Sequence, residues 1–414
     1  MQLGCDSDRF RIFPVLLLAA CTILLPPALS AQVLMMGASG TVHLHMADRA
    51  VFEAAVDRDD LPCSVSPNKA VLGFDLRFHA SYEIGVPLSS LAGNENLLTI
   101  VLRVVTRDRP DEPTYLMQRV RVPSIEEDAK GDAYLHGGFD IGEGEYDVGL
   151  LMRDRSERVC SHFWDVESHL DGRDKDIELV LGPGQIAESE VEQFRDEPPV
   201  VRAGDRKLLN VKVLVNFAPQ NARAATLQPY DTSALVSILR TISRDPRIGK
   251  FSVVAFNMQE QRVLSRQDGV DRIDFHALGE SLDTLNLGTI DLTRLTEKHG
   301  ETRFLTRLML DELSTAKDAD ALIFAGPKAL LEENIPREDL AELGAIDFPI
   351  FYMNYNLFPQ RSPWRDAISH AVRFLNGTEY TITRPPDLWF SVREMVSQIV
   401  EMKQIREVSR NGLE

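Results

Sequence analysis

The first half of the sequence is built from short apolar segments separated by turn residues. Several segments alternate between apolar and polar positions, as Leu116, Gln118, Val120 and Val122 do. Short strands at regular spacing, with no convincing helix between them, predict an antiparallel β-sandwich. The predicted strands are Ala70–His79, Tyr82–Leu88, Leu97–Arg107, Thr114–Pro123, Tyr146–Asp154 and Val159–Val166.

From Leu208 onward, continuous apolar runs alternate with segments of helical periodicity. Leu208–Phe217 is an almost uninterrupted apolar run, and Thr232–Asp245 has helical spacing with Asp231 or Thr232 as its N-cap. This alternation predicts a mostly parallel, doubly wound α/β sheet. The other predicted strands are Lys250–Asn257, Gln261–Ser265, Ala321–Ala325, Phe348–Asn354 and Glu379–Thr383, and the other helices are Ile273–Leu285, Arg303–Thr315, Trp364–Leu375 and Asp387–Lys403.

A segment rich in proline and acidic residues separates the two patterns. It begins at Gly182-Pro183-Gly184, continues through several glutamates and aspartates, and ends after Pro198-Pro199. Such a composition is typical of a linker or of a short exposed helix followed by a linker. The predicted organisation is a leader at 1–31, a β-sandwich domain at 40–182, an acidic linker at 183–206, an α/β domain at 207–404 and a tail at 405–414.

The amino terminus has the features of an export signal. Arg9 and Arg11 precede an apolar run from Ile12 to Leu25, and small residues suited to cleavage end at Ala31. The alternative is a lipobox ending at Cys21, which would carry lipid and anchor the protein to a membrane. We therefore expect an exported protein, periplasmic or extracellular, with a lipoprotein as the alternative.

The cysteines are consistent with that location. Cleavage after Ala31 leaves Cys63 and Cys160 of the four cysteines, and an even pair in an oxidising compartment predicts a disulfide. Two free buried thiols are the alternative. The sequence contains no Cys-x-x-Cys, which argues against redox catalysis and a zinc ribbon.

Composition and charge exclude several classes of protein. The 45 basic and 63 acidic residues give a net charge of −18, which argues against binding to nucleic acid or to an anionic membrane surface. A hydrophobic fraction of 44% rules out a mostly disordered chain. No phosphate-binding glycine loop, hydrolase nucleophile motif or zinc-protease motif is present, so no cofactor is predicted.

The second half resembles the von Willebrand factor A domain. Phe251–Asn257 followed by Gln261–Leu264 is similar to the family's second strand and edge hairpin. Gly288-Thr289 resembles a loop that leads into a helix, and Asp320–Gly326 lies where the fourth strand is expected. Gly377–Ile382 is similar to the closing strand. The resemblance implies the fold and a protein-binding role.

In the first half, Phe139–Val148 resembles the late part of an immunoglobulin-like domain. There, a Gly-x-Tyr step leads into the penultimate strand, and Gly144 and Tyr146 occupy those positions here. The resemblance implies that the tyrosine ring packs at the corner of the sandwich.

The sequence departs from the A-domain pattern at the residues that hold a divalent cation. Active members carry Asp-x-Ser-x-Ser after the first strand, a threonine in a later loop and an aspartate after the fourth strand. Here the first strand is followed by Asn216–Gln220 without a carboxylate, and Lys328 stands near the position of the last acid. Thr289 could match the threonine. Hard cations need anionic oxygens, so we expect no metal at this position.

The candidate ligand-binding residues follow the predicted parallel strands. Parallel sheets bind ligands beyond the carboxyl ends of their strands, and amides and a lysine there could hydrogen-bond a small anion or a peptide. The alternative is that the asparagines satisfy turn backbone groups. The candidates are Asn216, Gln220, Asn257, Thr289, Lys328 and Asn354. His43 and His45, spaced for one face of a strand, lack an identifiable third metal ligand.

These patterns predict an exported, non-enzymatic protein that acts in protein binding or envelope assembly through a metal-independent A-like domain. No nucleophile and base can be paired from the sequence, which argues against an enzyme. One alternative is an enzyme or small-ligand binder that uses the strand edge around Asn216, Lys328 and Asn354. A purely structural surface module is the other. The identity of the protein partner is not readable from the sequence.

Overall fold

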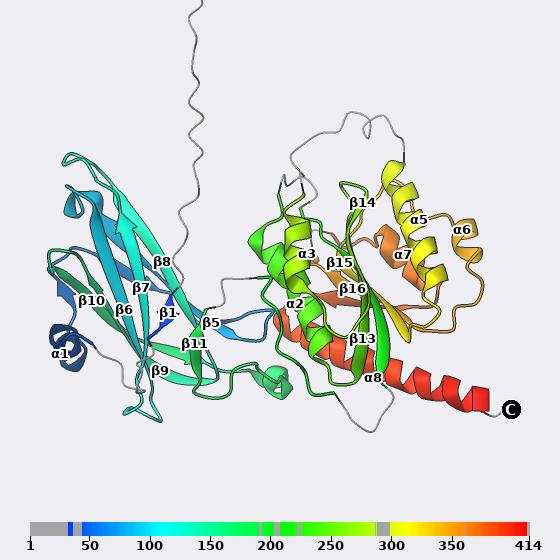
Figure 1. The fold of residues 1–414 in the computed structure, drawn as a ribbon, viewed down its shortest axis with the longest axis horizontal. Helices are drawn as coiled ribbons and strands as arrows, with labels where there is room; N and C mark the ends of the chain where they lie inside the picture. The colour runs from blue at the N-terminus through cyan, green and yellow to red at the C-terminus, as the bar shows by residue number, and fades with distance from the viewer. Residues whose placement is uncertain are drawn as a thin grey trace, which may run out of the picture. The chain divides into compact units, whose positions relative to one another are not determined.

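The chain contains a region of antiparallel sheets followed by a region of alternating strands and helices (Figure 1). The structure, a computed structural model, describes residues 32–35, 44–189, 193–202, 208–221, 224, 226–285, 287, 299–360 and 362–411. We call the elements from β1 to β11 the sandwich region and those from β12 to α8 the α/β region. The predicted leader lies outside the described residues.

The sandwich region consists of two antiparallel sheets. The first has the strand order β1-β7-β6-β9-β10-β2, and the second has the order β11-β8-β5-β3, with β4 also paired to β5. The strands of the first sheet are β1 (Val33–Leu34), β2 (Arg58–Asp59), β6 (Asn96–Thr106), β7 (Thr114–Val122), β9 (Gly144–Arg153) and β10 (Val159–Ser168). Those of the second are β3 (Ser64–Pro67), β4 (Val71–Leu72), β5 (Phe78–Pro87), β8 (Asp132–Ile141) and β11 (Ile186–Glu188).

The two sheets share a core formed by alternate residues of each strand. Ile84 of β5, Leu102 of β6 and Leu150 of β9 are fully buried in it. Tyr146 at the start of β9 is also fully buried, and its hydroxyl donates to the carbonyl oxygen of Gly142 at 2.8 Å. The predicted antiparallel sandwich is thus confirmed, and the tyrosine packs as expected.

Three features of the sandwich region differ from the predicted strands. The segments 70–79 and 82–88 were predicted as two strands, but the chain turns at Leu76, which has φ of 62°, and then runs as one strand through β5. Strand β8 was not predicted, because Gly137 and Gly138 interrupt its apolar pattern. Strand β11 falls within the predicted linker and pairs with β8.

A helix covers part of the outer face of the first sheet. Helix α1 (Met46–Ala54) packs Val51 and Phe52 against Val101 and Leu151 of the sheet. His45 immediately precedes this helix, so the strand predicted for the two histidines is wrong at this position. His43 lies outside the described residues.

The predicted disulfide is present between Cys63 and Cys160. The bond joins the residue before β3 to strand β10, with the two Cα atoms 6.2 Å apart, and it therefore connects the two sheets. Such a bond indicates an oxidising compartment. Within the described part of the chain, no helix combines the length and the apolar composition needed to cross a bilayer.

The α/β region is built on one six-stranded sheet. Its strand order is β14-β13-β12-β15-β16-β17, and every neighbouring pair is parallel except β13 and the edge strand β14. The strands are β12 (Leu209–Asn216), β13 (Ile248–Asn257), β14 (Arg262–Val270), β15 (Ala321–Pro327), β16 (Ile350–Tyr355) and β17 (Thr378–Ile382). The predicted alternation of strands and helices is present.

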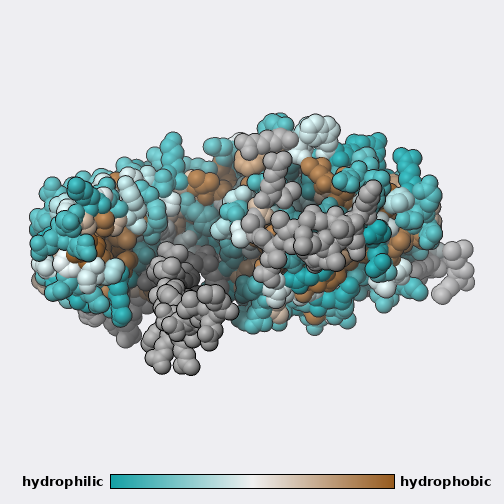
Figure 2. Space-filling model, turned by 90° about the horizontal axis from the view of Figure 1, so that it is seen from above, coloured by the Kyte–Doolittle hydropathy of each residue, from teal (hydrophilic) through white to brown (hydrophobic). Residues whose placement is uncertain are grey.

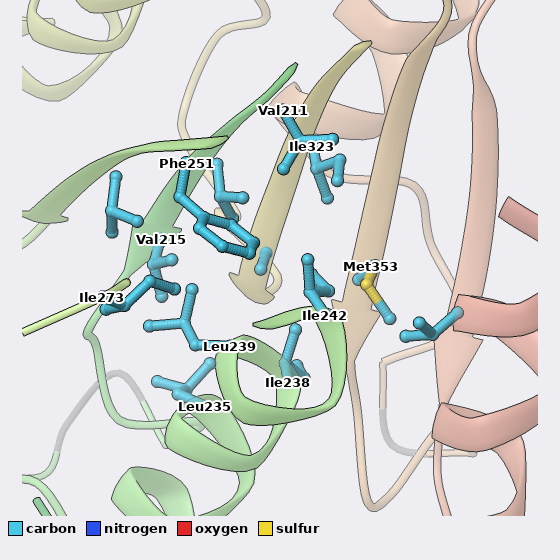
Figure 3. Packing of buried hydrophobic residues seen from close by; sticks show 14 of the residues in the cluster. Val211, Val215, Leu235, Ile238, Leu239, Ile242, Phe251, Ile273, Ile323 and Met353 are labelled. Carbon is cyan, nitrogen blue, oxygen red and sulfur yellow. The ribbon is translucent and has the colours of Figure 1, made fainter. Parts of the chain in front are cut away.

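Helices cover both faces of this sheet, so the sheet separates two hydrophobic cores. On one face, α2 (Pro229–Arg244) packs Leu235, Ile238 and Leu239 against Val215 and other strand residues, as Figure 3 shows. Helices α3 (Phe275–Leu282) and α8 (Pro385–Asn411) contribute to the same core. The opposite core contains α5 (Gly300–Thr315), α6 (Arg337–Ala341) and α7 (Ala367–Phe374).

Helix boundaries in the α/β region differ from the predicted ones at two functionally relevant points. Helix α2 begins at Pro229, so Asp231 lies inside its first turn and the predicted cap at Asp231 or Thr232 is wrong. Proline suits the first position of a helix because it lacks the N–H that would be unpaired there. Helix α8 continues to Asn411, through most of the predicted tail.

We expect the disulfide to contribute substantially to stability. The Cys63→Ala/Cys160→Ala variant should lose about 2–5 kcal/mol of unfolding free energy, because the bond restricts the unfolded chain across 97 residues of sequence. Urea unfolding followed by circular dichroism measures the loss, with reduced wild-type protein as the control. Peptide mapping that finds both thiols free in unreduced protein would contradict the assignment.

Candidate functional site: the carboxyl edge of the parallel sheet

The sheet order reverses between β12 and β15, and the loops after these strands diverge to opposite faces. Ligands of open α/β folds bind in the crevice at such a switch point. The two strand ends approach closely, because a Cβ atom at Gly326 would lie 2.8 Å from the Cβ atom of Asn216. Gly326 also has φ of 150°, so no other residue fits there without strain.

The two asparagines that end β12 and β13 bind backbone groups. The side-chain oxygen of Asn216 accepts from the N–H of Met258 at 3.2 Å. Asn257 donates to the carbonyl oxygen of Phe217 at 2.6 Å and accepts from the N–H of Glu260 at 2.7 Å. Both residues are almost completely buried. These contacts match the structural alternative, in which the amides hold the loops.

The other predicted ligand-binding side chains also make contacts within the protein. The Lys328 Nζ donates to the carbonyl oxygens of Ser362 and Trp364 at 2.6 and 2.7 Å. The Asn354 amide donates to Glu379 at 3.0 Å, and the Gln220 amide reaches the carbonyl oxygen of Tyr355 at 3.5 Å. Thr289 lies outside the described residues. Lys328 therefore fixes the loop between β16 and α7.

A buried aspartate at this edge has no comparable partner. Asp231 is fully buried in the first turn of α2, and no described residue hydrogen-bonds to either carboxylate oxygen. Burial raises its pKa to about 6, an effect that the nearby backbone N–H groups of Gln220 and Gln228 only partly offset. At neutral pH, the carboxylate is thus a buried anionic acceptor with no donor in good hydrogen-bond geometry among the described residues.

The Tyr355 hydroxyl lies in the same environment. Tyr355 ends β16 on the face that α2 covers, and its hydroxyl also lacks a hydrogen-bond partner among the described residues. Its pKa is raised first by burial and then by the negative charge of Asp231. The two side chains together form a polar pair, which we call the Asp231–Tyr355 pair, inside an otherwise apolar core.

Asp366 shows how the same fold satisfies a buried aspartate. It caps α7, where its carboxylate accepts from the N–H groups of Ser369 and Ala329 at 2.9 and 2.7 Å and from the Tyr352 hydroxyl at 3.0 Å. Asp366 is only 2% exposed, so burial alone does not distinguish it from Asp231. The difference between the two aspartates lies in the donors, since the Asp231 carboxylate has none in comparable geometry among the described residues.

Large apolar side chains project into solvent from the loops of the same edge. They come from the start of α2 and from the loops that follow β15 and β16, and each is between 47% and 69% exposed. We call them the aromatic rim: Tyr230, Leu330, Phe358 and Trp364. Seen from above, the α/β region has several hydrophobic patches at its surface (Figure 2). Exposed aromatic groups of this kind are enriched at protein interfaces.

A second polar cluster lies in the sandwich region, where Asp75, His79 and Asp140 bring possible metal ligands within 4.8 Å of one another. His79 Nδ1 lies 2.7 Å from Asp140, and Nε2 lies 2.9 Å from Asp75. Arg77 also pairs with Asp140 at 3.2 Å. The two carboxylates flank opposite ring nitrogens, so each of them pairs with its own nitrogen of the His79 ring.

The charges of this cluster balance without a metal. Although burial alone lowers the pKa of His79, its hydrogen bonds to Asp140 and Asp75 raise the pKa to about 10. The imidazolium therefore donates from both nitrogens, and metal binding would require it to lose a proton. We interpret the cluster as a structural ion network that satisfies the buried Asp140.

Sequence reasoning missed both clusters. Asp231 was considered only as a helix cap, and the sequence signal that could have identified it was Pro229, which sets the helix start two residues earlier. The His79 cluster combines β5, β8 and the turn before β5, so no local spacing reveals it.

Comparisons with known proteins do not assign a function. No known protein family matches the sequence, and no curated protein is significantly similar. A superoxide reductase (neelaredoxin) of Ignicoccus hospitalis is 14% identical over 30% of this chain and 91% of that one, with a TM-score of 0.18. A β-glucuronidase of Bacteroides uniformis is 10% identical over 76% of this chain and 38% of that one, with a TM-score of 0.19. TM-scores this low support no inference about the fold or the function of this chain.

We expect the Asp231→Asn variant to be more stable than wild type at pH 8 by about 1–2 kcal/mol, because it removes an unpaired buried charge. The folded-state pKa is raised from 3.8 to about 6, so wild-type stability falls as the pH rises through this interval. The gain should therefore disappear near pH 4. Urea unfolding at both pH values measures it.

The matched variant is Asp366→Asn, which should destabilise the protein because three donors lose a charged acceptor. If Asp231→Asn destabilised the protein at pH 8 as Asp366→Asn does, the Asp231 carboxylate would have to accept hydrogen bonds in solution. That result would contradict the assignment of an unpaired charge.

The His79 ion network also predicts a loss of stability as the pH rises, in a higher pH interval than that of Asp231. Because folding raises the His79 pKa from 6.5 to about 10, its stabilisation is complete below pH 6.5 and is lost as the pH rises to 10. The His79→Gln variant should be less stable at pH 6 and should show a flatter pH dependence above it. His136→Gln, in the exposed part of the same sheet, is the control. If the unfolding free energy of His79→Gln depended on pH as steeply as that of wild type, the ion network would not control this pH dependence.

Proposed function

We propose that this is an exported, non-enzymatic binding protein whose α/β region recognises a partner protein through the carboxyl edge of its sheet. The aromatic rim carries this proposal. Exposed aromatic side chains from separate loops share one edge, and tryptophan and tyrosine are enriched among the residues that supply most of the binding energy at protein interfaces. The disulfide supports an exported location.

The rim is held in place by the structure beneath it. Lys328 binds two carbonyl groups of the loop that carries Trp364, and Asp366 ties the end of that loop to Ala329. A loop fixed in this way loses little conformational freedom on binding, so more of the contact energy appears as affinity. This gives the predicted site residue Lys328 a supporting role in the proposed interface.

We further propose that the α/β region is a metal-independent relative of the von Willebrand factor A domain. The antiparallel pairing of β13 with the edge strand β14 and the place of β15 beside β12 support this resemblance. The loops after β12 and β15 offer amides and a lysine, which is the basis for expecting partner binding without a cation. Doubly wound sheets commonly have this strand order.

A second candidate function is binding or catalysis of a small molecule at the Asp231–Tyr355 pair. A carboxylate with a pKa of about 6 beside a tyrosine hydroxyl has the proton affinity that acid–base chemistry requires. The pair lacks an identified nucleophile, which is why we place this candidate second. Loss of function in Asp231→Asn with intact partner binding would favour it.

Photo-crosslinking tests the proposed interface. A benzoyl-phenylalanine placed at Trp364 in the exported full-length chain should form an adduct with one discrete protein, and a chelator should not reduce its yield. The same group at Phe374, which is 40% exposed at the far end of α7, is the matched control. Trp364→Ala and Phe358→Ala should weaken binding of the identified partner about tenfold or more.

Equal adducts from positions 364 and 374, or an adduct that disappears with chelator, would contradict the proposal. In the first case the rim has no special role, and in the second the interaction depends on a cation.

A further inference from the structure

A cavity in the sandwich region has the chemistry of a small-molecule site. Its volume is about 720 Å³, within the range of ordinary ligand sites, and it lies between α1, the outer face of the first sheet and the turn between β6 and β7. This site is separate from the carboxyl edge of the α/β region, so the inference does not depend on the proposed function.

Arg103 is a half-buried charged residue in the lining, and we call its surroundings the inner end of the cavity. It follows Val101 on the outer face of β6, beside the small apolar core under α1. On β9 the opposite residue is Gly149, and the rings of Phe163 and Phe52 lie where a side chain at Gly149 would be. Tyr115 stands opposite Arg103 on β7. The guanidinium group is thus bounded by aromatic rings.

The hydrogen-bonding capacity of Arg103 is largely unused. Among the described residues, Arg103 makes one long contact, 3.5 Å from its guanidinium to the carbonyl oxygen of Phe52, and no acid pairs with it. A guanidinium has five N–H donors in a fixed fork that matches a carboxylate. In a half-buried position, such a charge-assisted pair is stronger than at the surface.

Two further arginines line the cavity, and acidic residues balance them. Arg109 is held by the carbonyl oxygen of Gly184 at 3.0 Å and by Glu112 at 3.5 Å, while Arg49 on α1 has no acid partner among the described residues. Among the described lining residues, three arginines therefore face three acids, which are Glu53, Asp111 and Glu112. The three acids are exposed, whereas Arg103 is half-buried. The inner end of the cavity is therefore positively charged, and its outer part carries charges of both signs.

We propose that this cavity binds a small organic monocarboxylate, with the carboxylate on Arg103 and the body of the molecule against Tyr115. One negative charge matches the inner arginine, and a second would meet the acids of the outer part. The aromatic wall gives the body apolar contact. A multiply charged anion such as phosphate has neither advantage.

Titration calorimetry on the full chain at constant ionic strength tests this proposal. Benzoate and glucuronate should each be tried, because both carry one carboxylate, and their comparison distinguishes an apolar body from a hydroxylated one. At least one should bind saturably, and phosphate should bind more weakly. Arg103→Gln should weaken binding about tenfold or more, because it removes a charged bidentate donor.

Three variants separate binding from folding. Arg103→Lys keeps the charge without the fork and should give an intermediate affinity. Arg49→Gln changes an exposed residue of α1 and should also weaken binding while leaving urea unfolding unchanged. Arg119→Gln, an exposed residue of β7 outside the cavity, should have no effect. Absence of saturable binding by both carboxylates, tighter binding of phosphate, or equal affinities of wild type, Arg103→Gln and Arg49→Gln would overturn the proposal.

Discussion

The parallel sheet of the α/β region must be covered on both faces, and this constraint determines where its functional groups can lie. Strand β12 is buried along almost its whole length, so a polar side chain within it needs an internal partner. Lys212 illustrates this requirement, because it pairs with the buried Glu312, which also binds Arg266. Side chains that remain available for other molecules are consequently confined to the strand ends and loops.

The same constraint explains which parts of the fold could be predicted from the sequence. Continuous apolar runs identified β12 and β15, and helical periodicity identified α2 and α5, because burial on two faces or one face leaves a long, regular pattern. The sandwich strands were predicted from their alternation. Short elements such as α6 were missed, since five residues carry too little periodicity. Strand β8 was missed because its glycines interrupt the apolar pattern. Gly137 is needed there because a side chain would collide with the Tyr82 ring, a reason visible only in three dimensions.

The candidate site at the strand ends stays a prediction, and what the structure describes is how its proposed side chains are used. The topological rule placed it at the strand ends, yet Asn216, Asn257 and Lys328 use their polar groups on backbone atoms of the connecting loops. A sequence shows the capacity of an amide or an amine to bind, but whether neighbouring backbone already uses that capacity is a property of the folded chain. Asp231 was missed for the converse reason, because its unpaired state depends on which donors fold around it.

Unpaired polar groups therefore say more about function here than charge or composition does. The net charge of −18 argues against polyanionic partners, yet three arginines line the cavity under α1, with the acids of that cavity at exposed positions. Asp231 and Arg103 share one physical property, a hydrogen-bonding capacity that the described protein leaves largely unused. Folding alone favours replacing or pairing such groups, because an unpaired buried charge lowers stability. Their placement in a sheet edge and in a cavity, where another molecule can supply the missing partner, is the arrangement expected of binding sites.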